Sequence, residues 1–278
     1  MGICILPQEI VVPSVIPEPG KSLNEYTWDE ISYISSNGLA GEYGFQVGDA
    51  KAITLNGTVG SLALDNYQTY AYIIGINHNA ELEGNNLIHF QLAKTAISGG
   101  TDICFTDGSY NSSGSSAAFR MNTSNTNSGG WKDSYMRNNI CGTSKTSTSG
   151  RIMGAIPADL RNALKSVTKY TNNTGNSSSS GAVTATTDYF FLLAEYEVFG
   201  NITYSNTYEA NYQQQYAYYS AGNSKVKYRH NSTGSAARWW LRSPREGRSY
   251  DFVFVVTGGA VDYRDAYFSL GFAPCFCV

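Results

Sequence analysis

Apolar runs along this chain are short, and few of them follow helical spacing. The nearly continuous apolar run 70–76 predicts a buried strand. The run 252–256 predicts another strand, followed by a turn at Gly258-Gly259, and a last strand is predicted near 268–278. Strands therefore outnumber helices in the expected fold.

Helical spacing is clear in two places. Thr27 can cap a short helix, with Glu30 three residues further on as in a capping box. The clearest helix opens at Ile156-Pro157 and runs toward Val167. The apolar segment 188–200 fits either a buried strand or a short helix.

Polar segments separate these elements. The segment 45–55 predicts a hairpin around Gly48-Asp49, residues 105–130 predict a long irregular surface loop, and 171–187 predict a flexible stretch of low complexity. Residues 201–237 are tyrosine-rich and loop-like. The expected fold class is α+β with short strands, few helices and long loops.

The first twenty residues differ from the rest, because they hold four of the seven prolines. This predicts an extended N-terminal arm or linker over 1–20, with a strand on the domain's own sheet as the alternative. Residues 21–278 are then expected to form a single domain.

Charge and composition narrow the possible partners. Only 15% of the residues are charged and the net charge is −3, which argues against nucleic acid or an anionic membrane surface, because both require a basic patch. The 21 tyrosines, with abundant Ser, Asn and Gly, are typical of adaptable binding loops. A loop-rich protein without a special site has a similar composition, so that alternative stays open.

The cysteines are odd in number, scattered and without zinc-ligand spacing, which predicts small core residues in a protein made in a reducing cytoplasm. They are Cys4, Cys104, Cys141, Cys275 and Cys277. The N-terminus lacks the basic start of a signal peptide, and no apolar stretch is long enough to span a membrane, so membrane insertion is not expected.

Few residues offer catalytic chemistry. His78, His89 and His230 are far apart without metal-ligand spacing, and we interpret them as structural. Glu195 and Glu197 would share one face of a strand, but their apolar surroundings favour a structural partner such as an arginine or backbone amides. No P-loop, dinucleotide-binding, nucleophile-elbow or zinc-protease motif occurs. We expect no enzyme, no cofactor and no metal.

Several segments stand out by their order along the chain. They are Phe45-x-Val47-Gly48-Asp49-x-Lys51, Ile73-Ile74-Gly75-Ile76-Asn77-His78, Gly129-Gly130-Trp131 with Met136-Arg137, Ile156-Pro157-Ala158-Asp159-Leu160, Phe191-Leu192-Leu193 with Glu195-x-Glu197-Val198-Phe199-Gly200, Trp239-Trp240-Leu241-Arg242-Ser243-Pro244, and Gly271-Phe272-Ala273-Pro274. Over about residues 25–278 they resemble a phage- and prophage-associated family of uncharacterised domains. The C-terminal part is similar to the variable proteins of diversity-generating retroelements.

The resemblance implies a C-type-lectin-like fold of the formylglycine-generating-enzyme type. It also implies that residues between Pro244 and Gly271 are rewritten by mutagenesis at template adenines. Rewriting an AAC codon cannot produce Lys, Gln, Glu, Met or Trp, and the window 245–270 contains none of these except Glu246. Glu246 would then be a fixed position. Enzymes of that type use a reactive cysteine pair, but Cys275 and Cys277 lie in an apolar context at the chain end, so we do not expect that chemistry. The calcium-binding motifs of ordinary C-type lectins are not found, so calcium-dependent sugar binding is not expected either.

The window 245–270 interleaves arginines and aspartates with aromatic residues, and Tyr and Arg are favoured anchors of binding interfaces. The alternative is a charged solvent edge with aromatics in the core, and we expect Phe252, Val253 and Val255 to pack inward. The candidate ligand-binding residues are Arg245, Gly247, Arg248, Tyr250, Asp251, Phe254, Val256, Asp262, Tyr263, Arg264, Asp265, Tyr267, Phe268 and Leu270.

We interpret Trp239, Trp240, Arg242 and Pro244 as the scaffold beneath this surface. The two tryptophans are expected on opposite faces of a strand, and Arg242 is expected to hold loop carbonyls. The expected function is binding of a host-surface protein or glycan by a protein displayed on a phage tail, with other tail proteins as partners of the arm. A constant structural virion component and a carbohydrate-active enzyme remain the alternatives.

Overall fold

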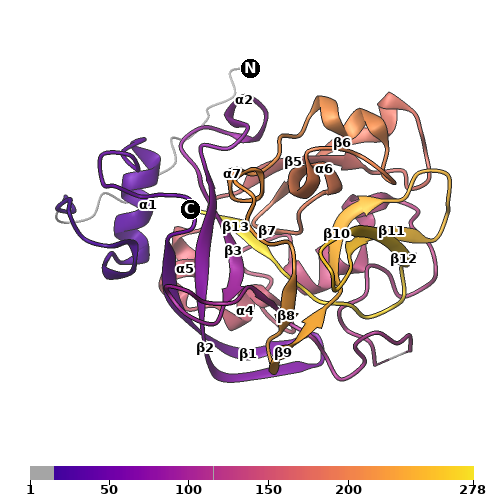
Figure 1. The fold of residues 1–278 in the computed structure, drawn as a ribbon, viewed down its shortest axis with the longest axis horizontal. Coiled ribbons are helices and arrows are strands. Elements are labelled where there is room, and N and C mark those ends of the chain that lie inside the picture. Colours follow the sequence, from indigo (N-terminus) through magenta and orange to yellow (C-terminus); the bar gives the residue numbers. More distant parts are fainter. Residues whose placement is uncertain (1–15, 115) are drawn as a thin grey trace, which may run out of the picture.

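The computed structural model describes residues 16–114 and 116–278. The proposed arm at 1–20 lies mostly outside these ranges. The described chain combines short helices with several small sheets, which confirms a mixed α+β fold (Figure 1). None of the helices in the described ranges has the length and apolar character needed to cross a membrane.

The largest sheet has five antiparallel strands in the order β1-β2-β3-β13-β7, so the last strand of the chain lies inside it. Its second strand contains the predicted run 70–76, which confirms that prediction. Its strands are β1 (Ala50–Val59), β2 (Leu62–Ile76), β3 (Ile88–Lys94), β13 (Cys275–Cys277) and β7 (Phe190–Phe191).

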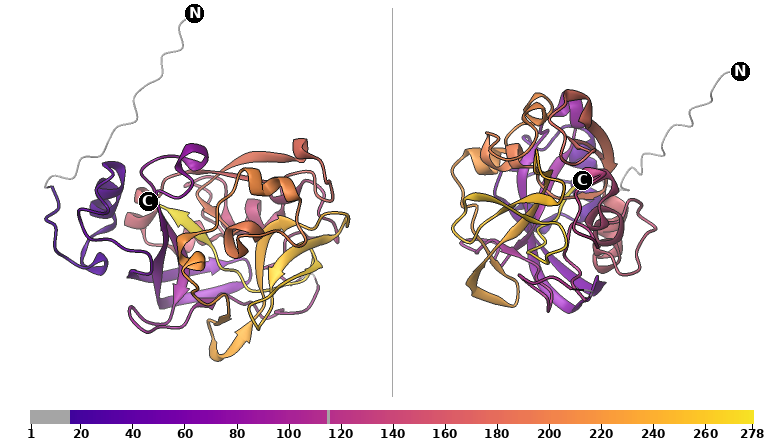
Figure 2. Two further views of the ribbon diagram at one scale, coloured as in Figure 1. Left: turned by 45° about the horizontal axis from the view of Figure 1, so that its top comes forward. Right: turned by 90° about the vertical axis from the view of Figure 1, so that its right-hand side faces the viewer.

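Three smaller sheets complete the fold, and the one that carries the candidate site is the antiparallel sheet β10-β11-β12. It lies at the opposite end of the long axis from α1 (Trp28–Ser36), as Figures 1 and 2 both show. The strands of the smaller sheets are β10 (Trp239–Pro244), β11 (Asp251–Val255) and β12 (Val261–Asp265); β4 (Ile103–Cys104), β8 (Lys227–Arg229) and β9 (Ser232–Ala237); and β5 (Val167–Asn172) and β6 (Val183–Asp188).

The helices are short. The predicted capping box is confirmed at α1, where Thr27 accepts the Glu30 amide and the Glu30 carboxylate accepts the Thr27 amide. The predicted helix toward Val167 is shorter than expected, because Val167 already begins β5. The other helices are α2 (Ala80–Glu83), α3 (Gly130–Asp133), α4 (Ile152–Ala155), α5 (Ala158–Ala163), α6 (Glu195–Phe199) and α7 (Ala217–Ser220), with helical turns η1 (Leu23–Glu25), η2 (Met136–Cys141), η3 (Ser180–Ala182) and η4 (Thr207–Asn211).

Two local predictions are wrong. Gly48-Asp49 forms a turn that precedes β1, and the hairpin that follows joins β1 to β2 instead. The stretch 171–187 is not irregular throughout, because residues 171–172 and 183–187 lie in the paired strands β5 and β6. The buried Asn172 amide explains the order between these strands, because it donates to the carbonyls of Gly175 and Ser177. Side-chain capping of this kind replaces the missing strand hydrogen bonds.

Two other predictions hold with a qualification. The segment 105–129 is irregular in its described part, but much of it is packed rather than exposed: the Asp107 carboxylate accepts the amides of Ala118 and Phe119 beneath it. The segment 188–200 contains both predicted elements, β7 and α6. The four described cysteines are unpaired and buried, as predicted, and Cys4 lies outside the described residues.

Candidate functional site

Residues of the predicted window 245–270 line one hollow beside β11 and β12. Nine of the fourteen candidate residues line it, and it has a volume of about 460 Å³. Among the residues that the structure describes, none outside the window lines it. The lining residues are Arg245, Arg248, Tyr250, Asp251, Tyr263, Arg264, Asp265, Tyr267 and Phe268.

Arginines in the hollow lie over aromatic rings. The Arg245 guanidinium carbon lies 3.4 Å from the ring centre of Tyr263, and the Tyr263 ring packs edge-on against Tyr204 at 5.0 Å. Arg264 lies 4.0 Å from the ring centre of Phe268. Such contacts are worth about 0.5–2 kcal/mol each and fix long side chains before a ligand arrives. The walls of the hollow are therefore preorganised.

A carboxylate pair lies in the same hollow. Asp251 and Asp265 are directly opposite on β11 and β12. Asp251 is buried and receives Arg245 Nη1 at 3.3 Å. Burial raises the pKa of Asp251, the Arg245 hydrogen bond lowers it, and the neighbouring Asp265 raises it further, so that the pKa lies above its ordinary value.

Five candidate residues lie outside the hollow, and for two of them the predicted surface position is wrong. Phe254 and Leu270 are 2% and 0% exposed, so they cannot belong to the surface of this fold. Phe254 packs edge-on against Trp240, because every residue of β11 is covered. Val256 and Asp262 are half-buried near the far end of the β11–β12 hairpin, and Gly247 is exposed in the loop that follows β10. The inward packing of Phe252, Val253 and Val255 is confirmed.

The loop 245–251 that forms one wall is held by Asn127, which the sequence did not single out. The Asn127 side-chain amide donates to the carbonyls of Arg248 at 2.6 Å and Asp251 at 3.0 Å. Its backbone amide donates to Ser249 at 2.8 Å. Gly175 lies against Asn127 with a φ of +102°, and a Cβ there would come within 2.5 Å of the Asn127 carbonyl oxygen. Only glycine fits this approach.

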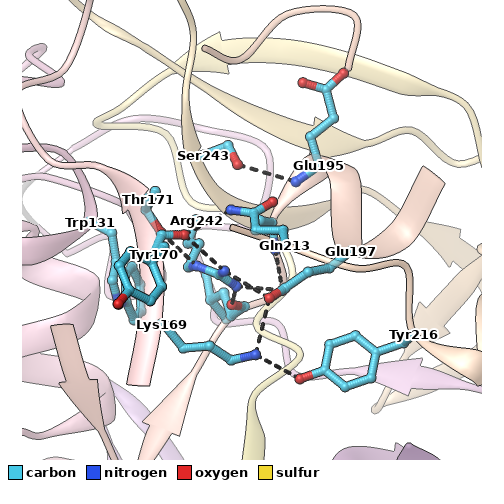
Figure 3. Close-up of polar contacts among 12 residues, drawn as sticks. Trp131, Lys169, Tyr170, Thr171, Glu195, Glu197, Gln213, Tyr216, Arg242 and Ser243 are labelled. Carbon is cyan, nitrogen blue, oxygen red and sulfur yellow. Dashed lines mark hydrogen bonds and ion pairs between the residues drawn. The ribbon is translucent and has the colours of Figure 1, made fainter. Parts of the chain in front are cut away.

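Arg242 on β10 anchors the frame beneath the hollow. Its guanidinium forms a bidentate ion pair with Glu197, one arm of which measures 2.8 Å (Figure 3). It also donates to the Leu192 and Tyr170 carbonyls and to the Thr171 hydroxyl. The prediction that Arg242 holds carbonyls is confirmed. The arginine predicted as a partner of the Glu195–Glu197 pair is Arg242, and it binds Glu197.

The charges around Arg242 form one buried cluster. Lys169 Nζ lies 3.0 Å from Glu197, 2.6 Å from Glu83 and 2.8 Å from the Tyr216 hydroxyl. Burial alone would raise the pKa of Glu197, but the charges of Arg242 and Lys169 outweigh it and hold the pKa below its ordinary value. Two basic side chains and two carboxyl groups therefore contact one another inside the protein, and burial raises the pKa of Glu83 to about 7 although Lys169 lies beside it.

Glu195 and Glu197 do not form the pair that a strand would give, because they lie on α6. Glu195 accepts the backbone amides of Thr203, Tyr204 and Ser205 instead. Its own amide donates to Ser243 Oγ, and its carboxylate points away from the Arg242 cluster (Figure 3). The backbone-amide partner predicted for this pair is therefore found at Glu195.

The remaining scaffold residues are buried on β10. Trp239 Nε1 donates to the Lys225 carbonyl and Trp240 Nε1 to the Phe119 carbonyl, so the two indoles fasten β10 to separate segments. The backbone amide of Trp240 donates to Gly271, which joins β10 to the closing segment 271–274. Pro244 is also buried.

The histidines are closer together than their spacing indicated. His78 and His89 have ring centres 5.6 Å apart, and His78 stacks on Tyr216 at 3.7 Å. Ligand atoms of His78, Glu83 and Glu197 lie within 4.8 Å of one another. Lys169 Nζ already binds both carboxylates, so a metal ion would have to displace this buried ammonium. The arrangement favours a structural ion cluster.

Comparison with known proteins gives one match. The family model described as "Domain of unknown function (DUF6273)" matches residues 108–278, which is more than half of the chain and includes the hollow, β10 and the closing strand. No curated protein and no solved structure matches the chain.

Proposed function

This chain belongs to the family described as a domain of unknown function (DUF6273), and we propose that it is a ligand-binding protein whose site is the hollow beside β11 and β12. One observation carries the proposal: a hollow lined entirely by arginine, aspartate and aromatic side chains from one short window of the chain. A few polar groups placed among aromatic walls are typical of ligand sites. The stacked arginines limit the entropy lost on binding.

We also propose a C-type-lectin-like fold and membership of the variable proteins of diversity-generating retroelements. Two features support this. The frame on either side of the window, β10 and 271–278, is entirely buried, whereas every residue that lines the hollow, apart from Asp251, retains some exposure. A buried frame under exposed positions is the arrangement that tolerates rewriting, since surface changes rarely affect stability. Phe254 and Leu270 would then be held constant.

Sequencing of the gene locus tests the diversification. We expect a near-copy of the 3′ end of the gene whose differences fall at template adenines, together with a reverse-transcriptase gene. The differences should affect codons for residues that line the hollow and spare the codons of Phe254 and Leu270. A locus without such a copy would leave a constant structural virion component as the better hypothesis.

In this proposal the partner is a host-surface protein or glycan, and the protein is displayed on a phage tail. Binding is favoured over catalysis because both glutamates that an enzyme hypothesis could use have structural partners: Glu195 is bound by backbone amides and Glu197 by Arg242 and Lys169. We therefore expect no turnover on a glycan panel.

Cell binding tests the site itself. Labelled protein is titrated onto a panel of bacterial strains, and we expect saturable binding to some strains. Tyr263→Ala should weaken that binding at least about tenfold, because a central aromatic anchor is removed. Thr257→Ala is the matched control, since Thr257 is exposed on the same hairpin and does not line the hollow. Equal loss in both variants, or binding unaffected by Tyr263→Ala, would place the site elsewhere.

A further inference from the structure

The charges in the hollow are only partly paired. Arg245 has a carboxylate partner in Asp251. Neither Arg248 nor Arg264 lies within ion-pair distance of a carboxylate in the described part of the chain. Arg248 donates to the Tyr250 hydroxyl, and Arg264 Nε is buried without any acceptor. The buried Nε is closed to a ligand, so a ligand in the hollow would reach Arg264 through the terminal nitrogens of its guanidinium, which have no carboxylate partner among the described residues.

Besides the two arginines without a carboxylate partner, the hollow offers a carboxylate that can accept hydrogen bonds and an aromatic surface. Asp265 lines the same hollow and forms no ion pair with a described residue. Phe268 and Tyr267 pack edge to face at 5.2 Å and contribute ring surface beside Arg264. A ligand that satisfies all three features carries an anionic group, hydroxyl donors and a compact apolar face.

We propose that this hollow binds an oligosaccharide through a sugar that carries a carboxylate. The inference rests on the function proposed above and names the ligand class of the same site. The sugar carboxylate accepts from Arg264 and Arg248, its hydroxyls donate to Asp265, and its C–H face packs on Tyr267, while the Phe268 ring supports Arg264 from beneath. A guanidinium binds a planar carboxylate with two parallel hydrogen bonds, which gives geometric specificity as well as affinity.

Other ligand classes match the hollow less well. A neutral sugar supplies no charge for the two free guanidiniums. A densely sulfated or phosphorylated chain brings several negative charges close to Asp251 and Asp265, which repel them. An acidic peptide supplies the carboxylate but has fewer hydroxyl donors for Asp265. The hollow has a volume of about 460 Å³, which lies in the size range of pockets for small ligands.

Binding is tested with the purified chain on an array that holds carboxylated, neutral, sulfated and phosphorylated oligosaccharides and acidic peptides. Each carboxylated sugar is paired with its carboxyl-reduced form, which keeps the ring and linkages but replaces the acid by an alcohol. We expect at least one carboxylated sugar to bind and its reduced form to bind at least about tenfold more weakly, the loss typical of a charge-assisted hydrogen bond.

Three variants locate that effect. Arg264→Gln should weaken binding of the carboxylated sugar about tenfold and leave any residual binding of the reduced form unchanged. Arg264→Lys keeps the positive charge but loses the planar guanidinium, and its affinity for the carboxylated sugar should lie between those of Arg264→Gln and wild type. Arg238→Gln is the matched control, because Arg238 is half-buried, bonds Asn111 and does not line the hollow. Thermal unfolding verifies that all three variants fold.

The outcomes separate this inference from the proposed function. Preference for neutral, sulfated or phosphorylated sugars or for peptides, or equal binding by wild type and Arg264→Gln, overturns the carboxylated sugar as ligand. If strains still bind the protein through Tyr263 in that case, the binding function stands and only the ligand class is wrong. If neither cells nor array bind, both proposals fail.

Discussion

Arg242 and Glu197 form a bidentate ion pair in which neither side chain has any exposed surface. The pair joins β10, which leads into the loop of the hollow, to α6, and Lys169 connects it onward to Glu83 on α2. Because a buried charge without its partner is strongly unfavourable, the position of β10 depends on the Arg242–Glu197 pair being intact.

Removing Glu197 should therefore be costly. Glu197→Gln removes the carboxylate that Arg242 and Lys169 share, and we expect the free energy of unfolding to fall by about 3–5 kcal/mol in urea titrations at pH 7. The double variant Glu197→Gln/Arg242→Gln keeps the Lys169–Glu83 pair and should lose clearly less than the sum of the two single variants. Additive losses would mean that the two residues do not act as a pair.

Asn127 is predicted to control the wall of the hollow. Asn127→Ala removes the donors to the carbonyls of Arg248 and Asp251 and should lower the free energy of unfolding by about 1–3 kcal/mol. Hydrogen exchange should accelerate mainly at residues 247–251, and ligand binding should weaken. Asn125→Ala, an exposed change on the same segment, is the control. Unchanged hydrogen exchange at residues 247–251 of Asn127→Ala would contradict the role of Asn127 in holding this loop.

Local signals in the sequence were reliable where a feature depends on neighbouring residues. The capping box of α1 needs only Thr27 and Glu30, three residues apart, and the structure contains it. The walls of the hollow were found for a similar reason, because its lining residues all come from one window of 24 residues, 245–268. Alternation is no guide on β11, because the strand is covered on both faces and Phe254 is buried together with its neighbours.

Contacts between segments that lie far apart in the sequence have no comparable local sequence pattern. Lys169 meets Glu83 across 86 positions, and Asn127 meets Arg248 across 121, so neither contact has a spacing pattern. Low complexity predicts flexibility for the stretch 171–187, in which threonine, serine and asparagine are the commonest residues. Its order comes from buried hydrogen bonds, among them Asn172 N to Glu209, whose partners are invisible in the composition.

Stability should distinguish the surface of the hollow from its frame. Arg248→Ala should change the free energy of unfolding by no more than about 0.5 kcal/mol, because the side chain is exposed and forms a single hydrogen bond. Phe254→Ala should lower it by about 3–5 kcal/mol, since a buried ring beside Trp240 is replaced by a cavity. Urea titrations of the two variants measure this difference. Similar losses of stability in the two variants would contradict the proposal that residues lining the hollow can vary while Phe254 is held constant.

Glu209 should make stability depend on pH. It is fully buried and accepts from Asn172 N, Ser243 Oγ and Gln213 Nε2, yet burial outweighs these hydrogen bonds and raises the pKa of its carboxyl to about 7. In the unfolded chain the pKa is near its ordinary value of 4.5. Between these two values the folded protein binds more protons, so this group lowers the free energy of unfolding as pH rises, by at most about 1.4 kcal/mol per pH unit.

Glu209→Gln removes that titration. Relative to wild type, the free energy of unfolding of the variant should therefore increase between pH 5 and pH 7, whatever the offset at pH 5. Urea titrations at half-unit steps measure the difference, and subtracting the wild-type curve cancels the contributions of groups that both proteins share, including Glu83, whose pKa burial also raises to about 7. Glu81→Gln on the exposed side of α2 is the control and should leave the wild-type curve unchanged in shape. A Glu209→Gln curve parallel to wild type would show that Glu209 is already ionised across this range.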